Sequence, residues 1–129
     1  MTQKTKATVL IVEDSPTQAL NIQQTLLEMG LDVVCAEDGL AGLRQAQRLL
    51  PDLIVLDVQL PEMNGFEVIR ELKKWPETEV IPVILLTRHD TPDAVKFGMA
   101  YGAIDFIPKD AFAMAVLKET IQQMDLLHE

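Results

Sequence analysis

The sequence is poor in several features that mark particular classes of protein. Cys35 is its only cysteine, so the chain can neither form an internal disulfide nor bind zinc through a cysteine cluster. A membrane-spanning helix needs an apolar run of about 18 residues, and no run in this sequence approaches that length. Basic residues number 11 against 20 acidic ones, and a net charge of −9 leaves no basic stripe for nucleic acid. We therefore expect a cytoplasmic protein that binds neither membrane nor nucleic acid directly.

The length and composition fit one ordinary domain. The chain has 129 residues, of which 48% are hydrophobic, enough to build a core. Residues 1–129 show no linker, low-complexity tract or internal repeat, so we expect a single domain. Cys35 lies within the apolar stretch 33–36, which predicts a buried side chain that behaves as a small apolar residue.

Short apolar runs alternate with stretches of helical spacing along the chain. The runs are apolar throughout, which is typical of strands covered on both faces. Helix caps are predicted at Ser15, at Asp38, at Asn64 with Glu67 as its capping-box partner, and at Asp90 or Thr91. Strands are predicted at 8–12, 31–36, 53–56, 82–86 and 104–107, and helices at 16–30, 39–50, 65–75, 92–101 and from 111 onward. Five strands alternating with five helices predict an α/β fold with a doubly wound parallel sheet.

Polar side chains follow four of these strands at the point where each strand ends. Glu13 and Asp14 follow the first strand, Asp57 the third, Thr87 the fourth and Lys109 the fifth. In an open parallel sheet these positions share the carboxyl-end rim, where ligands bind. The sequence therefore predicts that these side chains form one pocket.

The chemistry of that pocket favours a hard cation and a phosphoryl group. Three carboxylates and Lys109 leave a local charge of about −2, and crowded like charges need neutralisation. All donors are oxygens, which selects Mg²⁺, or Mn²⁺, over zinc or copper. Asp57 is placed to attack phosphorus, and Thr87 to donate a hydrogen bond to the transferred group. Taken alone, each residue could have an ordinary structural role instead. Glu13 and Asp14 could interact with the dipole of the helix that follows them, and Lys109 could be a solvated surface lysine.

Five stretches of the sequence match one family pattern: 9–14, 51–57, 60–65, 82–87 and 102–109. Through them the chain resembles the receiver domain of two-component response regulators, in particular the chemotaxis receivers. The resemblance implies a flavodoxin-like sheet of strand order 2-1-3-4-5. It implies a protein that accepts a phosphoryl group and catalyses its own phosphorylation and slow autodephosphorylation, and that is otherwise not an enzyme.

The resemblance also implies residue roles at the rim. Asp57 would accept the phosphoryl group, and Lys109 would pair with its oxygens. Asp14, Asp57 and the backbone carbonyl of Gln59 would bind Mg²⁺, with Glu13 acting through water. The phosphodonor would be a phosphohistidine on a sensor histidine kinase or a phosphotransfer protein.

Further positions follow from the same resemblance. Thr87 and Phe106 would form the switch pair that relays phosphorylation as a conformational change. Gln59, Arg88 and His89 would tune the lifetime of the acyl phosphate. The surface formed by the helix at 92–101, the strand at 104–107 and the last helix would meet a downstream target or a second copy. Phe97, Met99 and Tyr101 could be exposed contacts of that surface or core residues at helical spacing.

One position departs from the family pattern, and other functions compete with the switch. The family usually has proline after the lysine, but here Pro108 precedes Lys109 and Asp110 follows it, which excludes a cis Lys–Pro bond. A receiver-like module that docks constitutively is one alternative. An aspartyl-phosphate hydrolase is another, although Gln59 occupies the position where such enzymes place a second aspartate. A flavin or dinucleotide carrier would need a phosphate loop that residues 13–16 do not provide.

Overall fold

The computed structural model describes residues 6–88, 92–124 and 126, and it shows five parallel strands in one sheet. The strand order is β2-β1-β3-β4-β5, as the resemblance implied. The strands are β1 Thr8–Val12, β2 Asp32–Ala36, β3 Leu53–Asp57, β4 Val83–Thr87 and β5 Asp105–Pro108. The helices are α1 Pro16–Glu28, α2 Gly39–Leu49, α3 Gly65–Leu72, α4 Pro76–Glu79, α5 Pro92–Ala100 and α6 Ala113–Gln122. The doubly wound parallel fold is therefore confirmed.

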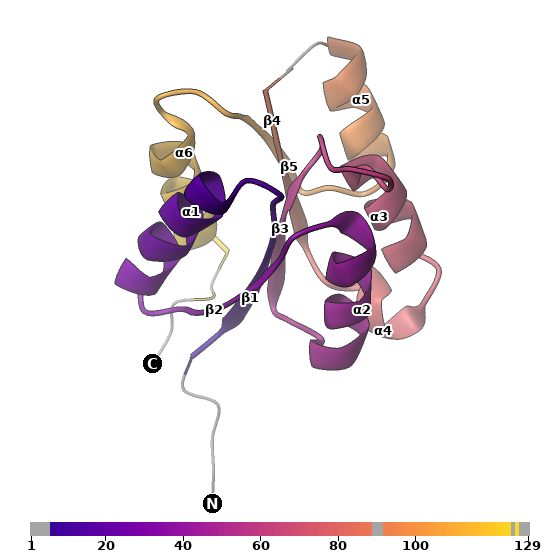
Figure 1. Ribbon diagram of the computed structural model, residues 1–129, viewed down its shortest axis with the longest axis horizontal. Helices are drawn as coiled ribbons and strands as arrows, with labels where there is room; N and C mark the ends of the chain where they lie inside the picture. Colours follow the sequence, from indigo (N-terminus) through magenta and orange to yellow (C-terminus); the bar gives the residue numbers. More distant parts are fainter. Residues whose placement is uncertain (1–5, 89–91, 125, 127–129) are drawn as a thin grey trace, which may run out of the picture.

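Helices cover both faces of the sheet, as Figure 1 shows: α1 and α6 lie on one side, and α2 to α5 on the other. Val9 and Ile11 of β1 pack toward α1 and α6, whereas Leu10 and Val12 pack toward the opposite helices. This alternation follows from the two-residue period of a strand. Every residue of β3 and β4 is buried, which explains why these strands are apolar almost throughout.

The helix caps predicted within the described residues are confirmed. The Ser15 hydroxyl accepts a hydrogen bond from the Gln18 amide, and the Asp38 carboxylate accepts one from the Ala41 amide. Asn64 and Glu67 form the predicted reciprocal capping box, with hydrogen bonds of 3.0 and 3.1 Å. The cap proposed at Asp90 or Thr91 lies outside the described residues.

The prediction of five helices misses one short helix. The third predicted helix ends at Leu72, and the separate four-residue helix α4 follows from Pro76. Proline at the first position of α4 starts a new turn, while the buried hydroxyl of Thr78 donates to the Leu72 carbonyl at 2.6 Å. Among the residues that the structure describes, no helix combines the length and apolar character needed to cross a membrane.

The prediction that Cys35 is buried is wrong. Cys35 is exposed because β2 is an edge strand of the sheet, paired on one side only with β1. Asp32 of the same strand is also exposed, and Val33 and Val34 are only half-buried. An apolar sequence thus forms a strand at an edge where the covering helices do not enclose every side chain.

Close packing of α2 against β1 depends on a glycine. A Cβ atom added at Gly42 would lie 2.7 Å from one Cγ atom of Val12 and 2.9 Å from the other. Val12 is 1% exposed and immediately precedes Glu13, so this contact supports the strand end that carries the acidic residues.

We expect Gly42→Ala to destabilise the protein by about 1–3 kcal/mol because the new methyl group overpacks the Val12 side chain. Helix propensity alone predicts the opposite effect, an increase of about 1 kcal/mol in the free energy of unfolding. Urea unfolding of Gly42→Ala, Val12→Ala and the double variant measures both effects. The cost of Gly42→Ala should shrink when Val12 is already Ala, and an unchanged cost would contradict the steric explanation.

Candidate functional site

The side chains predicted to meet at the carboxyl-end rim lie close together in the structure. Asp57 is the last residue of β3, and Thr87 is the last residue of β4. The register aligns the strand ends, pairing Val12 with Leu56 and Thr87 with Pro108. Glu13 and Lys109, which directly follow β1 and β5, are therefore carried to the same rim.

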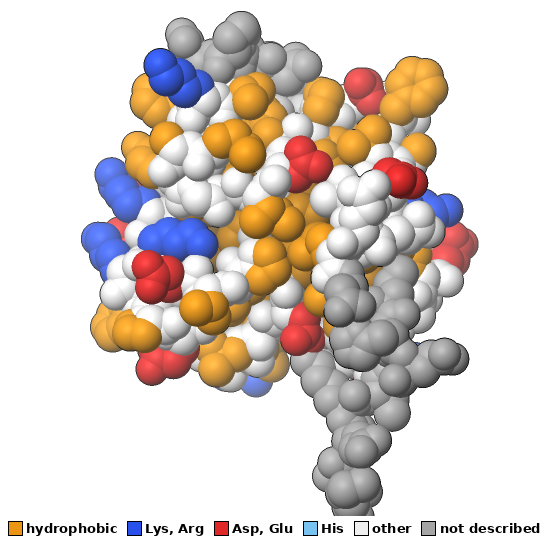
Figure 2. Space-filling model, turned by 180° about the vertical axis from the view of Figure 1, so that it is seen from behind, with side chains coloured by type: hydrophobic (Ala, Val, Ile, Leu, Met, Phe, Trp, Pro, Cys, Tyr) orange, Lys and Arg blue, Asp and Glu red, His pale blue; other side chains and the backbone are white. Residues whose placement is uncertain are grey.

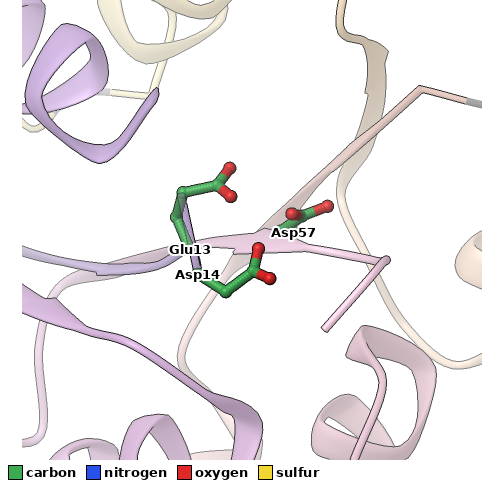
Figure 3. A group of neighbouring side chains, drawn as sticks. All are labelled: Glu13, Asp14 and Asp57. Carbon is green, nitrogen blue, oxygen red and sulfur yellow. The ribbon is translucent and has the colours of Figure 1, made fainter. Parts of the chain in front are cut away.

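The carboxylates of Glu13, Asp14 and Asp57 converge (Figure 3). One oxygen from each of the three lies within 4.8 Å of the others. Glu13 and Asp57 are buried at 3% and 1% exposure, whereas Asp14 is exposed. The cluster therefore has two carboxylates inside the protein and one at the solvent boundary.

Lys109 provides the positive charge that faces the two buried carboxylates. Its ammonium nitrogen lies 2.6 Å from Glu13 Oε1 and 2.8 Å from Asp57 Oδ2. Its backbone amide donates to the Thr87 carbonyl at 2.6 Å, which anchors the residue beside the end of β4. Lys109 is thus held at both ends, and its side chain is only 10% exposed.

The electrostatics of the cluster remain unbalanced despite Lys109. Burial raises the pKa of the Glu13 carboxyl above its ordinary value; the hydrogen bond from Lys109 opposes this shift, and the charge of Asp57 adds to it. Loss of water around Glu13 is thus the main cost of its negative charge, and the nearby charge of Asp57 increases that cost. A bound cation would relieve that penalty.

The donor set fits Mg²⁺ or Mn²⁺. Asp57 Oδ1 accepts a hydrogen bond from the Gln59 amide at 3.0 Å. Asp57 Oδ2 is buried, and among the described residues it has no hydrogen-bond donor and only the ion pair with Lys109. Buried polar atoms are normally satisfied, so this oxygen has capacity for another electrophilic partner. Three carboxylates without a neighbouring histidine or cysteine favour a hard cation.

Thr87 and Phe106, the expected switch pair, lie on the same face of the sheet. Phe106 pairs with Leu85, and Thr87 follows Leu85 by two residues, so its side chain points to that face. Thr87 is fully buried, whereas Phe106 is half-buried and packs on the core beneath α5. A Cβ atom added at Gly98 of α5 would lie 2.8 Å from the Phe106 ring.

Gln59 makes side-chain contacts that the sequence did not predict. Its Nε2 donates to the Thr87 hydroxyl at 2.8 Å, and its Oε1 accepts from the Arg88 amide at 3.2 Å. The two partners lie 28 and 29 residues further along the chain, so no local pattern signals the bonds. Arg88 is exposed beside the site, and His89 lies outside the described residues.

Gly65 allows the loop after β3 to fold back on the site. A Cβ atom there would lie 2.6 Å from the Asp57 carbonyl oxygen, and the Gly65 amide donates to the Val58 carbonyl at 3.0 Å. Helix α3 thus begins directly against the backbone of Asp57. All peptide bonds in the described part of the chain are trans, including the one preceding Pro108.

Comparison with known proteins gives a consistent result. The family model described as "Response regulator receiver domain" matches residues 9–122. Protein PilH of Pseudomonas aeruginosa is 37% identical over 112 residues, which cover 87% of this chain and 93% of PilH. In further curated relatives the chain spans only 23–43% of the relative's length.

Solved structures agree with the sequence comparison. The chemotaxis response regulator CheY4 of Vibrio cholerae has a TM-score of 0.85 at 33% identity, covering 92% of this chain and 98% of the other. The receiver domain of the sensor histidine kinase PA1611 from Pseudomonas aeruginosa has a TM-score of 0.83 at 28% identity, covering 92% and 96%. The latter structure contains a magnesium ion coordinated in its active-site cleft.

We expect Mg²⁺ to raise the melting temperature of the protein, because an ion that binds only the folded state stabilises it. Asp14→Asn should weaken the apparent Mg²⁺ affinity by roughly tenfold or more, since even partners of metal ligands contribute about 10- to 100-fold. The measurement is thermal unfolding across a MgCl₂ titration at constant ionic strength.

Asp32→Asn, an identical change at an exposed residue at the start of β2, is the matched control and should titrate like the wild type. Equal stabilisation of Asp14→Asn and the wild type by Mg²⁺ would contradict a metal site at the acidic cluster.

Proposed function

This chain belongs to the response regulator receiver domain family, and we propose that it is a phosphorylation-dependent signalling switch of a two-component system. Residues 1–129 act as one receiver domain in this proposal, and the protein works in the cytoplasm. A phosphohistidine on a sensor histidine kinase or a phosphotransfer protein donates the phosphoryl group. The observation that supports this function best is the buried Asp57 carboxylate beside Lys109 at the rim of the sheet.

The proposed transfer is a nucleophilic displacement by Asp57. A carboxylate oxygen of Asp57 forms a bond to phosphorus, the phosphorus–nitrogen bond of the phosphohistidine breaks, and the imidazole nitrogen keeps the electron pair. Lys109, already 2.8 Å from Asp57 Oδ2, would then pair with the transferred oxygens. The chain in this way catalyses its own phosphorylation and, with water as the acceptor, its slow dephosphorylation.

Asp14, Asp57 and the Gln59 backbone carbonyl would hold Mg²⁺, with Glu13 contributing through water, and Mn²⁺ could replace it. When bound, the ion supplies positive charge that offsets the crowded carboxylates and the incoming phosphoryl oxygens. Glu13 and Lys109 already form an ion pair of 2.6 Å, so Glu13 orients the lysine beside the acceptor.

The proposed output is a shift between two conformations. The Thr87 hydroxyl turns toward the phosphoryl group, and the Phe106 ring moves inward into the space that the Thr87 side chain leaves. Phosphorylation can bias this equilibrium only through contacts that differ between the two states. The buried hydroxyl of Thr87 and the ion pairs of Lys109 are the contacts best placed to differ.

The surface of α5, β5 and α6 is the proposed site for a downstream target or a second copy. Phe97 and Met99 are exposed, while Tyr101 is half-buried and packs near Phe66 and Phe97. Ile104 and Val116 are also exposed. Figure 2 shows hydrophobic side chains gathered on the side of the molecule turned away in Figure 1. A homodimer through α5, β5 and α6 is one form that this contact could take.

Asp57→Asn should abolish covalent labelling by a small phosphodonor such as acetyl phosphate in the presence of Mg²⁺. The amide removes the nucleophilic oxygen but keeps the size of the side chain. Intact-protein mass spectrometry measures the labelled fraction, and Asp32→Asn, a matched change at an exposed residue, should label like the wild type. Stoichiometric labelling of Asp57→Asn would remove Asp57 as the acceptor.

A further inference from the structure

One residue contacts both the phosphoacceptor and the switch hydroxyl. The backbone amide of Gln59 donates to Asp57 Oδ1 at 3.0 Å, while its side-chain amide donates to Thr87 Oγ1 at 2.8 Å. Its side-chain oxygen accepts from the Arg88 backbone amide at 3.2 Å. The Gln59 side chain therefore spans from the loop after β3 to the end of β4.

This bridge restrains the position of Thr87. Both polar ends of the Gln59 amide are occupied, so the side chain is fixed in one orientation relative to residues 87 and 88. The bond to Thr87 is partly buried, and Thr87 itself is 0% exposed, whereas the bond from the Arg88 amide is exposed. A hydrogen bond to a buried group is costly to break without replacement. Any turn of the Thr87 hydroxyl away from its present position must break the bond from Gln59.

We propose that the Gln59 side chain is a positioning residue that holds Thr87 in its resting position and so sets how readily the switch is activated. This inference rests on the proposed function and deepens it. In this proposal the bond to Thr87 forms only in the resting conformation, so its loss raises the population of the activated one. An activating ligand then binds more tightly because less of its binding free energy is spent on the conformational change.

A Gln59 side chain that supported the activated conformation would have the opposite effect on the affinity for an activating ligand. If Gln59 instead aims the Thr87 hydroxyl toward the phosphoryl group, the bond persists in the activated state and supports it. Removing the Gln59 amide would then weaken binding of an activating ligand. The sign of the effect therefore decides between restraint and support.

The experiment measures binding of beryllofluoride, a mimic of the phosphoryl group, to the full chain at saturating Mg²⁺. The variants are Gln59→Met, which keeps the side-chain length but removes both polar groups, Thr87→Val, and the double variant. Gln59→Met should bind beryllofluoride roughly five-fold more tightly, the equivalent of one net hydrogen bond of about 1 kcal/mol. In the Thr87→Val background the same change should have no effect, because the hydroxyl that Gln59 restrains is absent.

A spectroscopic readout separates positioning from a general structural role. In the wild type, the side-chain amide signals of Gln59 should shift when beryllofluoride is added, as the bond to Thr87 breaks. Gln47→Met is the matched control. Gln47 is exposed on α2, so this substitution makes the same chemical change away from the site. It should leave beryllofluoride affinity unchanged.

Three results would overturn the inference: unchanged affinity in Gln59→Met, weaker affinity, or an equal gain in the Thr87→Val background. Each of these still requires the wild type to bind beryllofluoride, so the switch function would stand. Failure of the wild type to bind it at saturating Mg²⁺ would instead refute the proposed function, and the restraint with it.

Discussion

The ion pairs of Lys109 with Glu13 and Asp57 are the interaction on which the site depends. One ammonium group lies within 2.8 Å of two carboxylates that are almost completely buried. Buried charges are costly unless they are paired, and one positive charge cannot balance three nearby carboxylates. The site is therefore stable enough to form, yet it retains an attraction for a cation and for a group that can bond to Asp57. Burial is the main cause that raises the pKa of Glu13, and the negative charge of Asp57 adds to the shift.

The sheet holds the like-charged side chains of the site close together despite their repulsion. β3 and β4 are buried along their whole length, so Asp57 and Thr87 extend from strands that are packed on both faces. Gly42 lets α2 pack closely on the Val12 side chain at the end of β1, and Gly65 lets α3 begin against the backbone of Asp57 at the end of β3. Side chains that would repel one another in water are thereby kept at fixed positions on one rim.

Sequence reasoning located the site because position in a parallel sheet follows from strand ends. Glu13, Asp57 and Lys109 could be assigned to one rim without knowing any contact between them, since each follows an apolar strand. Reasoning from apolar neighbours failed for Cys35, because its exposure depends on β2 lying at an edge of the sheet. Local composition is the same for an edge strand and a central one when both are apolar.

Helix α4 and the bond between Gln59 and Thr87 could not be predicted from the sequence either, because both depend on tertiary contacts. Helix α4 is only four residues long and is held by the contact of the Thr78 hydroxyl with the Leu72 carbonyl, which no helical periodicity signals. The bond between Gln59 and Thr87 joins residues 28 positions apart, and a glutamine in a loop has no preferred partner. Tertiary contacts of this kind decide how the site behaves, whereas strand ends decide only where it lies.

The central claim is that Asp57, and no neighbouring carboxylate, carries the phosphoryl group. Borohydride reduction of the acyl phosphate followed by peptide mass mapping tests it most directly, because reduction converts the modified aspartate into homoserine at its own position. The account predicts homoserine at position 57 alone after treatment with phosphodonor and Mg²⁺. Reduction at position 13 or 14, or a stable phosphoryl group that borohydride does not remove, would contradict it.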